Sequence, residues 1–368
     1  MILHIFHDNN FIELTKGEFD KSKNENLYVI LSDKSDTKND ISHFDHQSLV
    51  TLIQENHFSC IVIHYLTSEK AEVILDSNYS GEVHWSIWGN DMYNSSFGFS
   101  ADGILDRDTK KYLKINEIKT SNKRRLFTNP LIKKIAHKLY FLVKRRVHPS
   151  QNITKLLPKI TSYSTVIPNE KDVINPFLIN ANYKPFTYGN LKTLIPIKYL
   201  NSSPKDLGNA ICVGNSATPS NNHLSAFSKL DSTLLVRIPF AYGEDRYKKA
   251  VLKDFDNNDN FHFLKEYVPY EKYMESLTLA NTLIINTHRQ QAVGTILMGL
   301  YLGMRIYLNA KNPTYHFLKD LGVEVFDFFE DFDNYKNKPM TCEQVQNNQK
   351  CVEKHWGEVA SDERMILF

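Results

Sequence analysis

Short apolar runs recur along the chain, and longer polar segments with helical spacing of their apolar positions separate many of them. Apolar runs of this kind, bounded by polar or turn residues, predict buried strands. We expect strands at 1–7, Leu27–Leu31, Cys60–His64, Val83–Ile87, Ala210–Val213, Leu234–Ile238, Thr282–Ile285 and Arg305–Leu308. We expect helices at Ser48–Asn56, His223–Lys229, Arg246–Phe255 and Tyr270–Ala280.

The alternation of strands and helices predicts an α/β fold with parallel sheets and right-handed crossovers. Two such series occur, so we expect two domains, at residues 1–195 and 206–345. The stretch that joins them is rich in proline and glycine, as linkers often are. Residues 346–368 have the apolar spacing of a C-terminal helix, which we expect to pack near the linker.

Length, charge and cysteine content narrow the class of protein. A chain of 368 residues that is 42% hydrophobic is long enough for two cores. A net charge of +2 argues against a general nucleic-acid binder, so we expect no nucleic acid partner. The 4 cysteines are scattered without a CxxC pair, which favours reduced thiols in the cytoplasm. The sequence shows neither a signal peptide nor an apolar run near the ~20 residues that span a bilayer, which predicts a soluble or peripheral protein.

The segment before and after Arg289 has the pattern of a buried strand, a polar loop and a helix that opens on Gly294 and Thr295. A helix start offers unpaired backbone N–H groups and the positive end of the helix dipole, and a small residue there lets a phosphate come close. Arg289 adds a permanent charge with bidentate reach. We therefore predict a diphosphate site here, with Gln290, Gln291 and, after the next strand, Asn309 as further polar groups.

A second strand, loop and helix begins at Gly214, where Asn215 and Ser216 offer polar donors beside a sharp turn. Ligands of open α/β sheets bind at such loops, outside the carboxyl ends of the strands. Ser220 or Asn221 can cap the following helix, and the whole loop can equally be ordinary turn and cap chemistry.

Arg237 lies within an otherwise apolar strand, where a charge needs a partner. That partner can be a ligand phosphate or an internal carboxylate. Tyr242, near the end of the same strand, can donate a hydrogen bond to a diphosphate oxygen.

In the first half of the chain, aromatic and polar residues gather at a strand end around Trp88, Gly89 and Asp91. Tryptophan faces suit sugar rings, and Asp91 is a candidate acid, base or hydroxyl acceptor. The alternative is a set of core aromatics with Asp91 as a helix cap. His7 and His64 also end strands, where a histidine is more often structural than catalytic.

The stretch from Lys119 to Arg146 carries ten Lys and Arg residues and no acidic residue. Leu131, Ile135, Leu139 and Leu142 fall on one helical face by their spacing. A basic amphipathic helix is typical of an interfacial membrane element, so residues 119–148 are a candidate for binding an anionic membrane surface. The alternative is a surface helix whose apolar face packs on the core.

Four of these segments together resemble one family. The order and approximate spacing of the motifs match, over about His64 to Pro313, the 4-acetamido-4,6-dideoxy-galactosyltransferases of enterobacterial common antigen synthesis, glycosyltransferase family 56. The motifs are WxIWGxDxY at Trp85–Tyr93, VGNSxxxSNxH at Val213–His223, VxxPxxY at Val236–Tyr242, and RQQxxGT at Arg289–Thr295, followed by Asn309 and Asn312-Pro313.

This resemblance implies a GT-B fold, in which two Rossmann-like domains face a central cleft. It implies transfer of a sugar, such as a 4-acetamido-4,6-dideoxy-hexose, from a TDP-sugar to a polyprenyl-diphosphate-linked glycan at the inner face of the cell membrane. The C-terminal domain would bind the donor and the N-terminal domain the acceptor. The basic stretch would then meet the membrane, making the enzyme cytoplasmic and peripheral.

The expected roles follow from the same resemblance and from the chemistry of the residues. The hexosyltransferase would need no metal or other cofactor, because a helix dipole and side-chain donors replace the metal. Asp106–Asp108 matches the letters of a DxD motif but precedes a Lys-Lys turn and not a nucleotide loop. Arg289 would neutralise the leaving group and Asp91 would deprotonate or orient the acceptor hydroxyl. The other expected donor-binding residues are Gly214, Asn215, Ser216, Arg237, Tyr242, Gln290, Gln291, Gly294, Thr295 and Asn309, and the expected acceptor-binding residues are His64, Trp88 and Gly89.

A second hypothesis is a sugar-nucleotide epimerase of GT-B shape or a soluble nucleotide-binding module. Neither would need the basic amphipathic stretch, so membrane binding distinguishes the two hypotheses.

Overall fold

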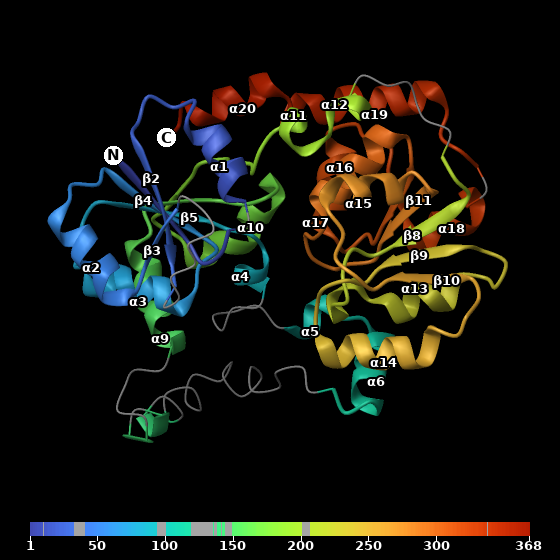
Figure 1. The fold of residues 1–368 in the computed structure, drawn as a ribbon, viewed down its shortest axis with the longest axis horizontal. Coiled ribbons are helices and arrows are strands. Elements are labelled where there is room, and N and C mark those ends of the chain that lie inside the picture. Colours follow the sequence, from blue (N-terminus) through green and yellow to red (C-terminus); the bar gives the residue numbers. More distant parts are fainter. Residues whose placement is uncertain are drawn as a thin grey trace. The chain divides into compact units, whose positions relative to one another are not determined.

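A computed structural model describes residues 1–9, 11–32, 41–93, 101–118, 135, 138–140, 142–143, 149–200, 207–336 and 338–368. The chain forms two compact units (Figure 1). Unit 1 comprises Met1–Ser100, Asn122–Asn190 and Glu358–Phe368, and unit 2 comprises Ala101–Ser121 and Leu191–Gly357.

Unit 1 is built on a seven-stranded sheet, sheet A, in the order β3-β2-β1-β4-β5-β6-β7, and every neighbouring pair is parallel. Its strands are β1 (Ile2–Phe6), β2 (Asn26–Leu31), β3 (Ser42–Phe44), β4 (Cys60–His64), β5 (Glu82–Ser86), β6 (Ser162–Ser164) and β7 (Asn182–Tyr183). Its helices are α1 (Ile12–Phe19), α2 (His46–Glu55), α3 (Ser68–Asp76), α4 (Asn90–Tyr93), α9 (Pro149–Leu156), η1 (Leu157–Lys159), η2 (Pro168–Glu170), α10 (Lys171–Ile174), η3 (Asn175–Phe177) and α20 (Glu358–Met365).

The two faces of sheet A differ in polarity, because side chains alternate between faces along a strand. One face carries fully buried aliphatic side chains, among them Leu3, Ile5, Ile61 and Ile63. The opposite face carries a buried polar stripe of His4, His64, His84, Ser86, Ser162 and Ser164. The strands of a parallel sheet are buried on both faces and are usually apolar, as the aliphatic face is. The buried polar stripe is stable only if its side chains form internal hydrogen bonds.

Those hydrogen bonds are present within unit 1. His4 Nδ1 lies 3.0 Å from His64 Nε2, and His64 Nδ1 lies 2.9 Å from the Tyr188 hydroxyl. The two ring nitrogens of His84 lie 2.9 Å and 3.0 Å from the hydroxyls of Ser162 and Ser164. Burial lowers the pKa of His4 and of His84 to about 3, and burial likewise lowers the pKa of His64. The imidazoles of this stripe are therefore neutral at pH 7.

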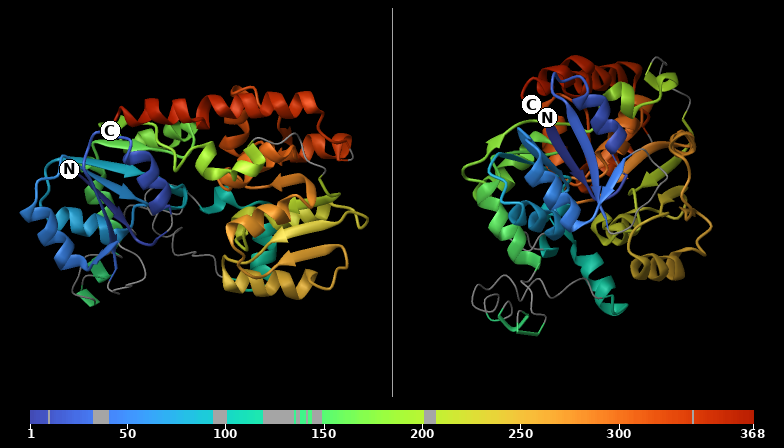
Figure 2. Two further views of the ribbon diagram at one scale, coloured as in Figure 1. Left: turned by 45° about the horizontal axis from the view of Figure 1, so that its top comes forward. Right: turned by 60° about the vertical axis from the view of Figure 1, so that its left-hand side comes forward.

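The C-terminal residues belong to unit 1 and pack against its N-terminal part. Helix α20 lies against α1, and the Ser361 hydroxyl donates to the buried Glu18 carboxylate. The Phe368 ring contacts the rings of Phe19 and His84 at 5.0 Å and 4.8 Å. Figure 2 shows the two chain ends close together in both views. The last residues thus help to cover the polar face of sheet A.

Unit 2 is built on a six-stranded sheet, sheet B, in the order β10-β9-β8-β11-β12-β13, and every neighbouring pair is parallel. Its strands are β8 (Ala210–Val213), β9 (Val236–Pro239), β10 (Phe261–Leu264), β11 (Ala280–Ile285), β12 (Arg305–Leu308) and β13 (Phe326–Asp327). Its helices are α5 (Ala101–Ile104), α6 (Arg107–Ile115), α11 (Leu191–Leu194), α12 (Ile197–Leu200), η4 (Pro219–Asn221), α13 (His223–Lys229), α14 (Asp245–Phe255), α15 (Tyr270–Leu277), α16 (Val293–Leu302), α17 (Pro313–Asp320), α18 (Phe328–Tyr335) and α19 (Cys342–Trp356).

Helix α16 is the central helix of unit 2. It is buried along nearly its whole length, as expected for a helix that is apolar on all sides. It ends at Gly303, whose φ of 88° is left-handed and suits a glycine. Helix α19 packs against α16 and begins with a capping box formed by Thr341 and Gln344.

The predicted parallel α/β architecture is confirmed, and Ala210–Val213, Arg305–Leu308 and His223–Lys229 match observed elements residue for residue. The compact units differ from the expected division at 195 and 206, because residues 101–121 cluster with unit 2. Residues 346–368 do not form one helix. Gly357 separates α19 from α20, and the two helices belong to different units. Within the described ranges, no helix has both the length and the apolar character that a membrane crossing requires.

The polar stripe predicts acid sensitivity. An unfolded histidine titrates near pH ~6.5, whereas His4 and His84 in the folded chain resist protonation down to a pKa of about 3. Below pH ~6.5 the unfolded chain binds protons that the folded chain does not, so the free energy of unfolding should fall as the pH falls. Urea unfolding at several pH values, followed by circular dichroism, measures this slope.

Two variants test whether the buried histidines cause this dependence of the free energy of unfolding on pH. His84→Gln cannot gain a proton and should reduce the acid slope, whereas His57→Gln, at an exposed histidine, should leave it unchanged. A free energy of unfolding that stays constant from pH 7 to pH 5 would contradict the assignment of neutral, buried histidines.

Candidate functional site

The strand order of sheet B defines where a ligand can bind. The order is that of a doubly wound Rossmann sheet, in which the chain reverses direction of growth between β8 and β11. Ligands of such sheets bind outside the carboxyl ends of the strands at this switch point. The two loops that meet there follow Val213 and Ile285, and they are the two loops that the sequence predicted.

The first loop turns at Gly214. Its φ of 72° is left-handed, and a Cβ there would lie 2.8 Å from His223 Nε2, so the position requires glycine. Asn221 organises this loop: its Oδ1 accepts from Asn215 N at 3.2 Å, and its Nδ2 donates to Ser216 O at 2.9 Å. The expectation that Ser220 or Asn221 caps α13 is wrong, because the N-cap residue is Asn222.

Side chains from the two loops are hydrogen-bonded to each other. Gln291 Nε2 donates to Asn215 Oδ1 at 2.8 Å, and Gln291 Oε1 accepts from the Ser220 hydroxyl at 2.9 Å. Asn215 Nδ2 in turn donates to the hydroxyl of Tyr242, whose side chain is 57% exposed. The structure thus brings together the predicted residues Asn215, Tyr242 and Gln291.

The second loop leads into the start of α16. Ala292 occupies the N-cap position with a φ of 62° and provides no side-chain hydrogen bond to the helix. A Cβ built on Gly294 meets no atom of the described residues within 4 Å, apart from its chain neighbours and the backbone of its own helix, so open space lies beside this helix start. Thr295, one residue further, approaches the Tyr273 hydroxyl at 3.5 Å. Backbone N–H groups beside open space are suited to an anion.

Arg289 and Gln290 lie on the second loop, and Arg237 lies on the adjacent strand β9. Arg289 Nη1 donates to Gln290 O at 3.0 Å, and Arg289 O accepts from the Thr287 hydroxyl at 2.9 Å. Gln290 is 5% exposed, and its Oε1 has no hydrogen-bond partner among the described residues. Arg237 Nε is likewise buried without a hydrogen-bond partner in the described part of the chain, where Arg237 forms no ion pair with a carboxylate. No described carboxylate therefore supports the internal alternative for Arg237, and contact with a ligand phosphate stays a prediction.

Ser216 and Asn309 are turned inward. Ser216 is 2% exposed, and its hydroxyl accepts from Asn221 Nδ2. Asn309 Nδ2 donates to Asn286 Oδ1 at 2.7 Å, and Asn309 Oδ1 accepts from Lys311 N at 2.9 Å. These two side chains support the loops, and their existing contacts explain why polar residues stand there.

Asn222 and Asn286, which sequence reasoning missed, link the two loops to each other. Asn222 Nδ2 donates to Asn286 O and Ile104 O, and Asn222 Oδ1 accepts from Asp106 N at 2.9 Å. Asn286 Nδ2 donates back to Asn222 O at 3.1 Å. Both side chains are almost fully buried. Asparagine at a strand end and at a helix start was the available signal, but the partners are remote in sequence.

A cavity of about 770 Å³ lies at the carboxyl ends of β11, β12 and β13, and both acidic and basic side chains line it, including Asp106, His288, Asn309 and Lys311. Asp106 is the N-cap of α6, which explains why an aspartate stands at the first position of the DxD letters.

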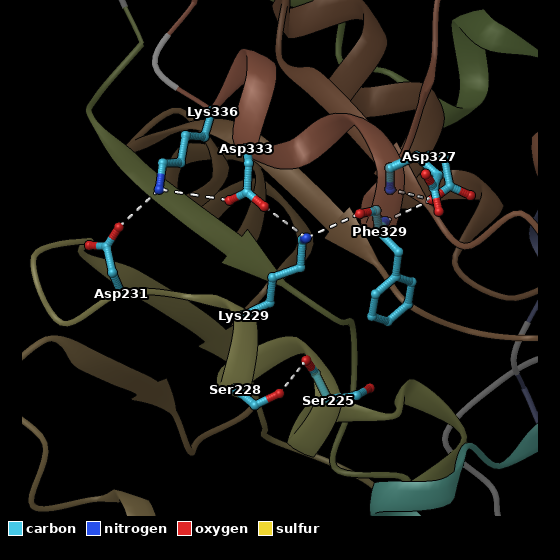
Figure 3. Close-up of polar contacts among 9 residues, drawn as sticks. Ser225, Ser228, Lys229, Asp231, Asp327, Phe329, Asp333 and Lys336 are labelled. Atoms are coloured by element: carbon cyan, nitrogen blue, oxygen red, sulfur yellow. Dashed lines mark hydrogen bonds and ion pairs between the residues drawn. The ribbon is translucent and has the colours of Figure 1, made fainter.

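Figure 3 shows Lys229, at the end of α13, between Asp333 and the Phe329 carbonyl. Within the described ranges, no group of three or more His, Cys, Asp or Glu residues is arranged to hold a metal ion.

In unit 1, two buried charges hold the loop after β4. Lys70 Nζ donates to the carbonyls of His64 and Tyr65, and burial lowers its pKa to about 7. Asp91 Oδ2 accepts from Leu66 N at 2.9 Å. Between these two anchors Tyr65 adopts a φ of 60°. A left-handed, bulky residue costs about 1–3 kcal/mol and persists only where its surroundings enforce it.

Asp91 itself is enclosed. It is 7% exposed, Oδ2 also accepts from Trp85 Nε1 at 2.8 Å, and Oδ1 accepts from Trp88 N at 3.0 Å. Burial raises the pKa of this carboxyl, and these hydrogen bonds oppose the rise. These contacts join the ends of β4 and β5, but Asp91 is not the helix cap of the alternative reading, because it lies within α4.

The predicted acceptor residues also lie at this edge of sheet A. His64 is fully buried and both its ring nitrogens contact side chains of unit 1. Trp88 is half-buried and its Nε1 donates to the Tyr188 hydroxyl. Gly89 has a φ of 91°, so a glycine suits this turn. Trp88 is the member of this set whose ring remains partly open to solvent.

Solved structures show which fold the chain has. The chain is similar to sucrose-phosphate synthase from Thermosynechococcus elongatus, with 10% identity, a TM-score of 0.61, and coverage of 100% of this chain and 97% of that one. It is similar to the lipopolysaccharide outer core galactosyltransferase WaaB, with 9% identity, a TM-score of 0.55, and coverage of 100% and 99%. It also matches WaaG, a glycosyltransferase involved in lipopolysaccharide biosynthesis, with 11% identity, a TM-score of 0.50, and coverage of 99% and 94%. The fold is therefore GT-B.

A family match then narrows the class. Residues 190–356 match the sequence model of the family described as 4-alpha-L-fucosyltransferase, glycosyl transferase group 56. This confirms the resemblance for the stretch that holds both loops of the sheet B switch point. The protein is a glycosyltransferase that uses a nucleotide-sugar donor and a glycan acceptor, and the epimerase and binding-module hypothesis is set aside.

The Asn222 contacts predict a large loss of stability on mutation. Asn222→Gly keeps the left-handed φ of 50° but leaves several buried groups of Ile104, Asp106 and Asn286 unpaired. Each such group costs about 1–3 kcal/mol, so unfolding in urea should show a loss on the order of 2–4 kcal/mol. Asn116→Ala, at the exposed end of α6, should cost at most about 1 kcal/mol. Equal losses for the two variants would contradict the role of Asn222.

Proposed function

We propose that the enzyme binds a nucleoside diphosphate sugar at the switch point of sheet B, with the diphosphate between the Gly214 loop and the start of α16. The observation that carries this proposal is the open space beside Gly294 at an uncapped helix start. The hydrogen-bonded residues Asn215, Gln291 and Tyr242 border this position from the two loops. A TDP-sugar carrying a 4-acetamido-4,6-dideoxy-hexose is the donor that the family resemblance supports.

The chemistry proposed is displacement of the nucleoside diphosphate by an acceptor hydroxyl. The acceptor oxygen forms a bond to the anomeric carbon as the bond from that carbon to the β-phosphate oxygen breaks. Negative charge develops on the leaving diphosphate, and the acceptor hydroxyl releases its proton to that diphosphate or to solvent. Arg289 and the N–H groups at the start of α16 would stabilise this charge. Arg237 and Gln290, whose buried Nε and Oε1 atoms have no hydrogen-bond partner among the residues that the structure describes, would contact the donor. No metal is assigned a role in this scheme.

The proposed acceptor is a polyprenyl-diphosphate-linked glycan at the inner face of the cell membrane, met by the basic segment 119–148. Most of this segment lies outside the described residues. Four of its apolar side chains are described, and they are 54–75% exposed: Ile135, Leu139, Leu142 and Val143. Exposed apolar residues among ten cationic ones support membrane contact over packing on a core.

The donor proposal is tested by ligand-induced stabilisation. A ligand that binds only the folded state raises the unfolding temperature by mass action. TDP should stabilise the enzyme more than UDP, GDP or CMP in a thermal-shift screen. A ranking of TDP below the other nucleotides would overturn the proposed base, while the absence of stabilisation by every nucleotide would overturn the donor site.

The position of the diphosphate is tested by filling the open space. Gly294→Val places a side chain in the space that the described residues beyond its own helix leave open. It should preserve the fold and block hydrogen bonds worth about 1.5–3 kcal/mol each to a phosphate, so the Kd for TDP should rise about ten- to a hundredfold. The matched control is Gly17→Val, an exposed helical glycine of unit 1 with equally open surroundings. Unchanged affinity in Gly294→Val would remove the diphosphate from this position.

The membrane proposal is tested by flotation with vesicles. The enzyme should float with vesicles containing anionic lipid, and high salt should reduce binding. Each basic residue near such a surface contributes about 1 kcal/mol, so changing six of them to glutamine should abolish flotation. The six are Lys133, Lys134, Lys138, Lys144, Arg145 and Arg146.

A matched control separates local from overall charge. Six lysines elsewhere, changed to glutamine, alter the net charge equally and should leave flotation intact: Lys23, Lys155, Lys159, Lys171, Lys350 and Lys354. Equal loss of flotation in both variants would show that overall charge, and not segment 119–148, binds the vesicles.

A further inference from the structure

We propose that the switch point of sheet A is a sugar-binding subsite, in which Tyr65, Trp88 and Phe11 form an aromatic platform for a pyranose ring of the acceptor. This inference rests on the proposed function for the identity of its ligand as the acceptor glycan. It goes beyond that function by naming the subsite, its chemistry and the residues that form it.

The topology places this platform where a ligand is expected. In sheet A the chain reverses its direction of growth between β1 and β4, which are parallel neighbours. The loops that follow these strands begin at His7 and Tyr65, at their carboxyl ends. Open α/β sheets bind ligands at this position.

The rings of the platform contact one another. The Tyr65 and Trp88 rings lie 5.5 Å apart at 61°, and the Phe11 and Trp88 rings lie 4.9 Å apart at 71°. Phe11 is 45% exposed, and Tyr65 and Trp88 are half-buried. Aromatic rings that share edges and keep part of their surface open can pack against the apolar C–H face of a sugar ring.

Two platform residues have backbone conformations that their side chains disfavour. Phe11 and Tyr65 have φ values of 63° and 60°. Such residues cluster at ligand sites, where the surrounding structure enforces them. For Tyr65 this enforcement comes from Lys70, which donates to the carbonyls of His64 and Tyr65, and from Asp91, which accepts from Leu66 N. The fold thus holds the Tyr65 ring at the edge of the sheet, although the left-handed backbone of Tyr65 is energetically unfavourable.

A polar edge accompanies the platform. His7 lies beside Tyr65, with ring centroids 4.8 Å apart, and its Nε2 pairs with Asp8 Oδ2 at 3.0 Å. His7 Nδ1 is buried and has no hydrogen-bond partner among the described residues. A buried polar atom without a partner is costly, and a hydroxyl of a bound sugar would supply one. Apolar rings beside a hydroxyl-binding nitrogen match a pyranose better than a flat nucleobase or a lipid chain.

The platform offers its own spectroscopic signal. The chain has 3 tryptophans, and of these Trp85 and Trp356 are buried at 0% and 2% exposure. Trp88 is the one that a ligand at this edge can contact. Titration of the full-length enzyme with methyl glycosides of glucose, galactose, N-acetylglucosamine and glucuronic acid should change its fluorescence for at least one of them, and Trp88→Phe should abolish the change.

Two substitutions at one position separate the ring from the fold. Tyr65→Asn keeps a residue that tolerates left-handed backbone but removes the ring, and it should weaken glycoside binding by at least about tenfold. Tyr65→Phe keeps the ring and loses only the hydroxyl that accepts from Asn90 Nδ2, so it should bind within about twofold of the parent. In transfer assays, Tyr65→Asn should raise the KM for the acceptor and leave the KM for the donor unchanged.

The outcomes separate this subsite from the donor proposal. Nucleotide stabilisation without any glycoside-dependent fluorescence change overturns the subsite and leaves the donor site standing. Glycoside binding that Tyr65→Asn does not weaken also overturns it, as does a nucleotide that competes for the Trp88 signal. Glycoside binding lost in Tyr65→Asn supports the subsite even where no nucleotide stabilises the enzyme.

Discussion

The reversal of strand order within each parallel sheet is the constraint on which the rest of the structure depends. In both sheets a first and a fourth strand lie side by side while their following helices diverge, so two loops meet without a helix between them. Buried polar side chains then fix these loops. Asn221, Asn222 and Asn286 do so in unit 2, and Lys70 and Asp91 do so in unit 1. Without such contacts the loops would pay for unpaired backbone groups at the sheet edge.

The fold could be predicted well from the sequence, because short apolar runs and helical spacing carry local information. The four central strands of sheet B followed from this pattern, whereas the edge strands β10 and β13 did not, and the two site loops were found from strand ends alone. The basic segment was recognised by composition, but most of it lies outside the described residues. The division into units was predicted less well, since contacts that assign 101–121 and 358–368 depend on residues far apart in the chain.

In the candidate sites, too, contacts between residues far apart in the chain could not be predicted from the sequence. Asn215, Gln291 and Tyr242 were predicted and are brought together, whereas Ser216, His64 and Asp91 have internal partners that account for them. A polar residue at a strand end has two uses, ligand contact and loop support, and its sequence neighbours do not distinguish them. Lys70 illustrates the problem: a lysine in a helix gives no hint that it is fully buried against two carbonyls.

The assignment of the last residues to unit 1 has a consequence for the order in which the protein can mature during synthesis. The chain leaves and re-enters unit 1, and residues 358–368 complete the cover over Glu18, Phe19 and His84. A ribosome makes the N-terminal residues first, yet the cover over their polar face is incomplete until residues 358–368 emerge. Unit 2 can close around its own sheet before that moment. The strands translated first therefore belong to a unit that is completed only after unit 2, and any change in residues 358–368 acts on the N-terminal half of the enzyme.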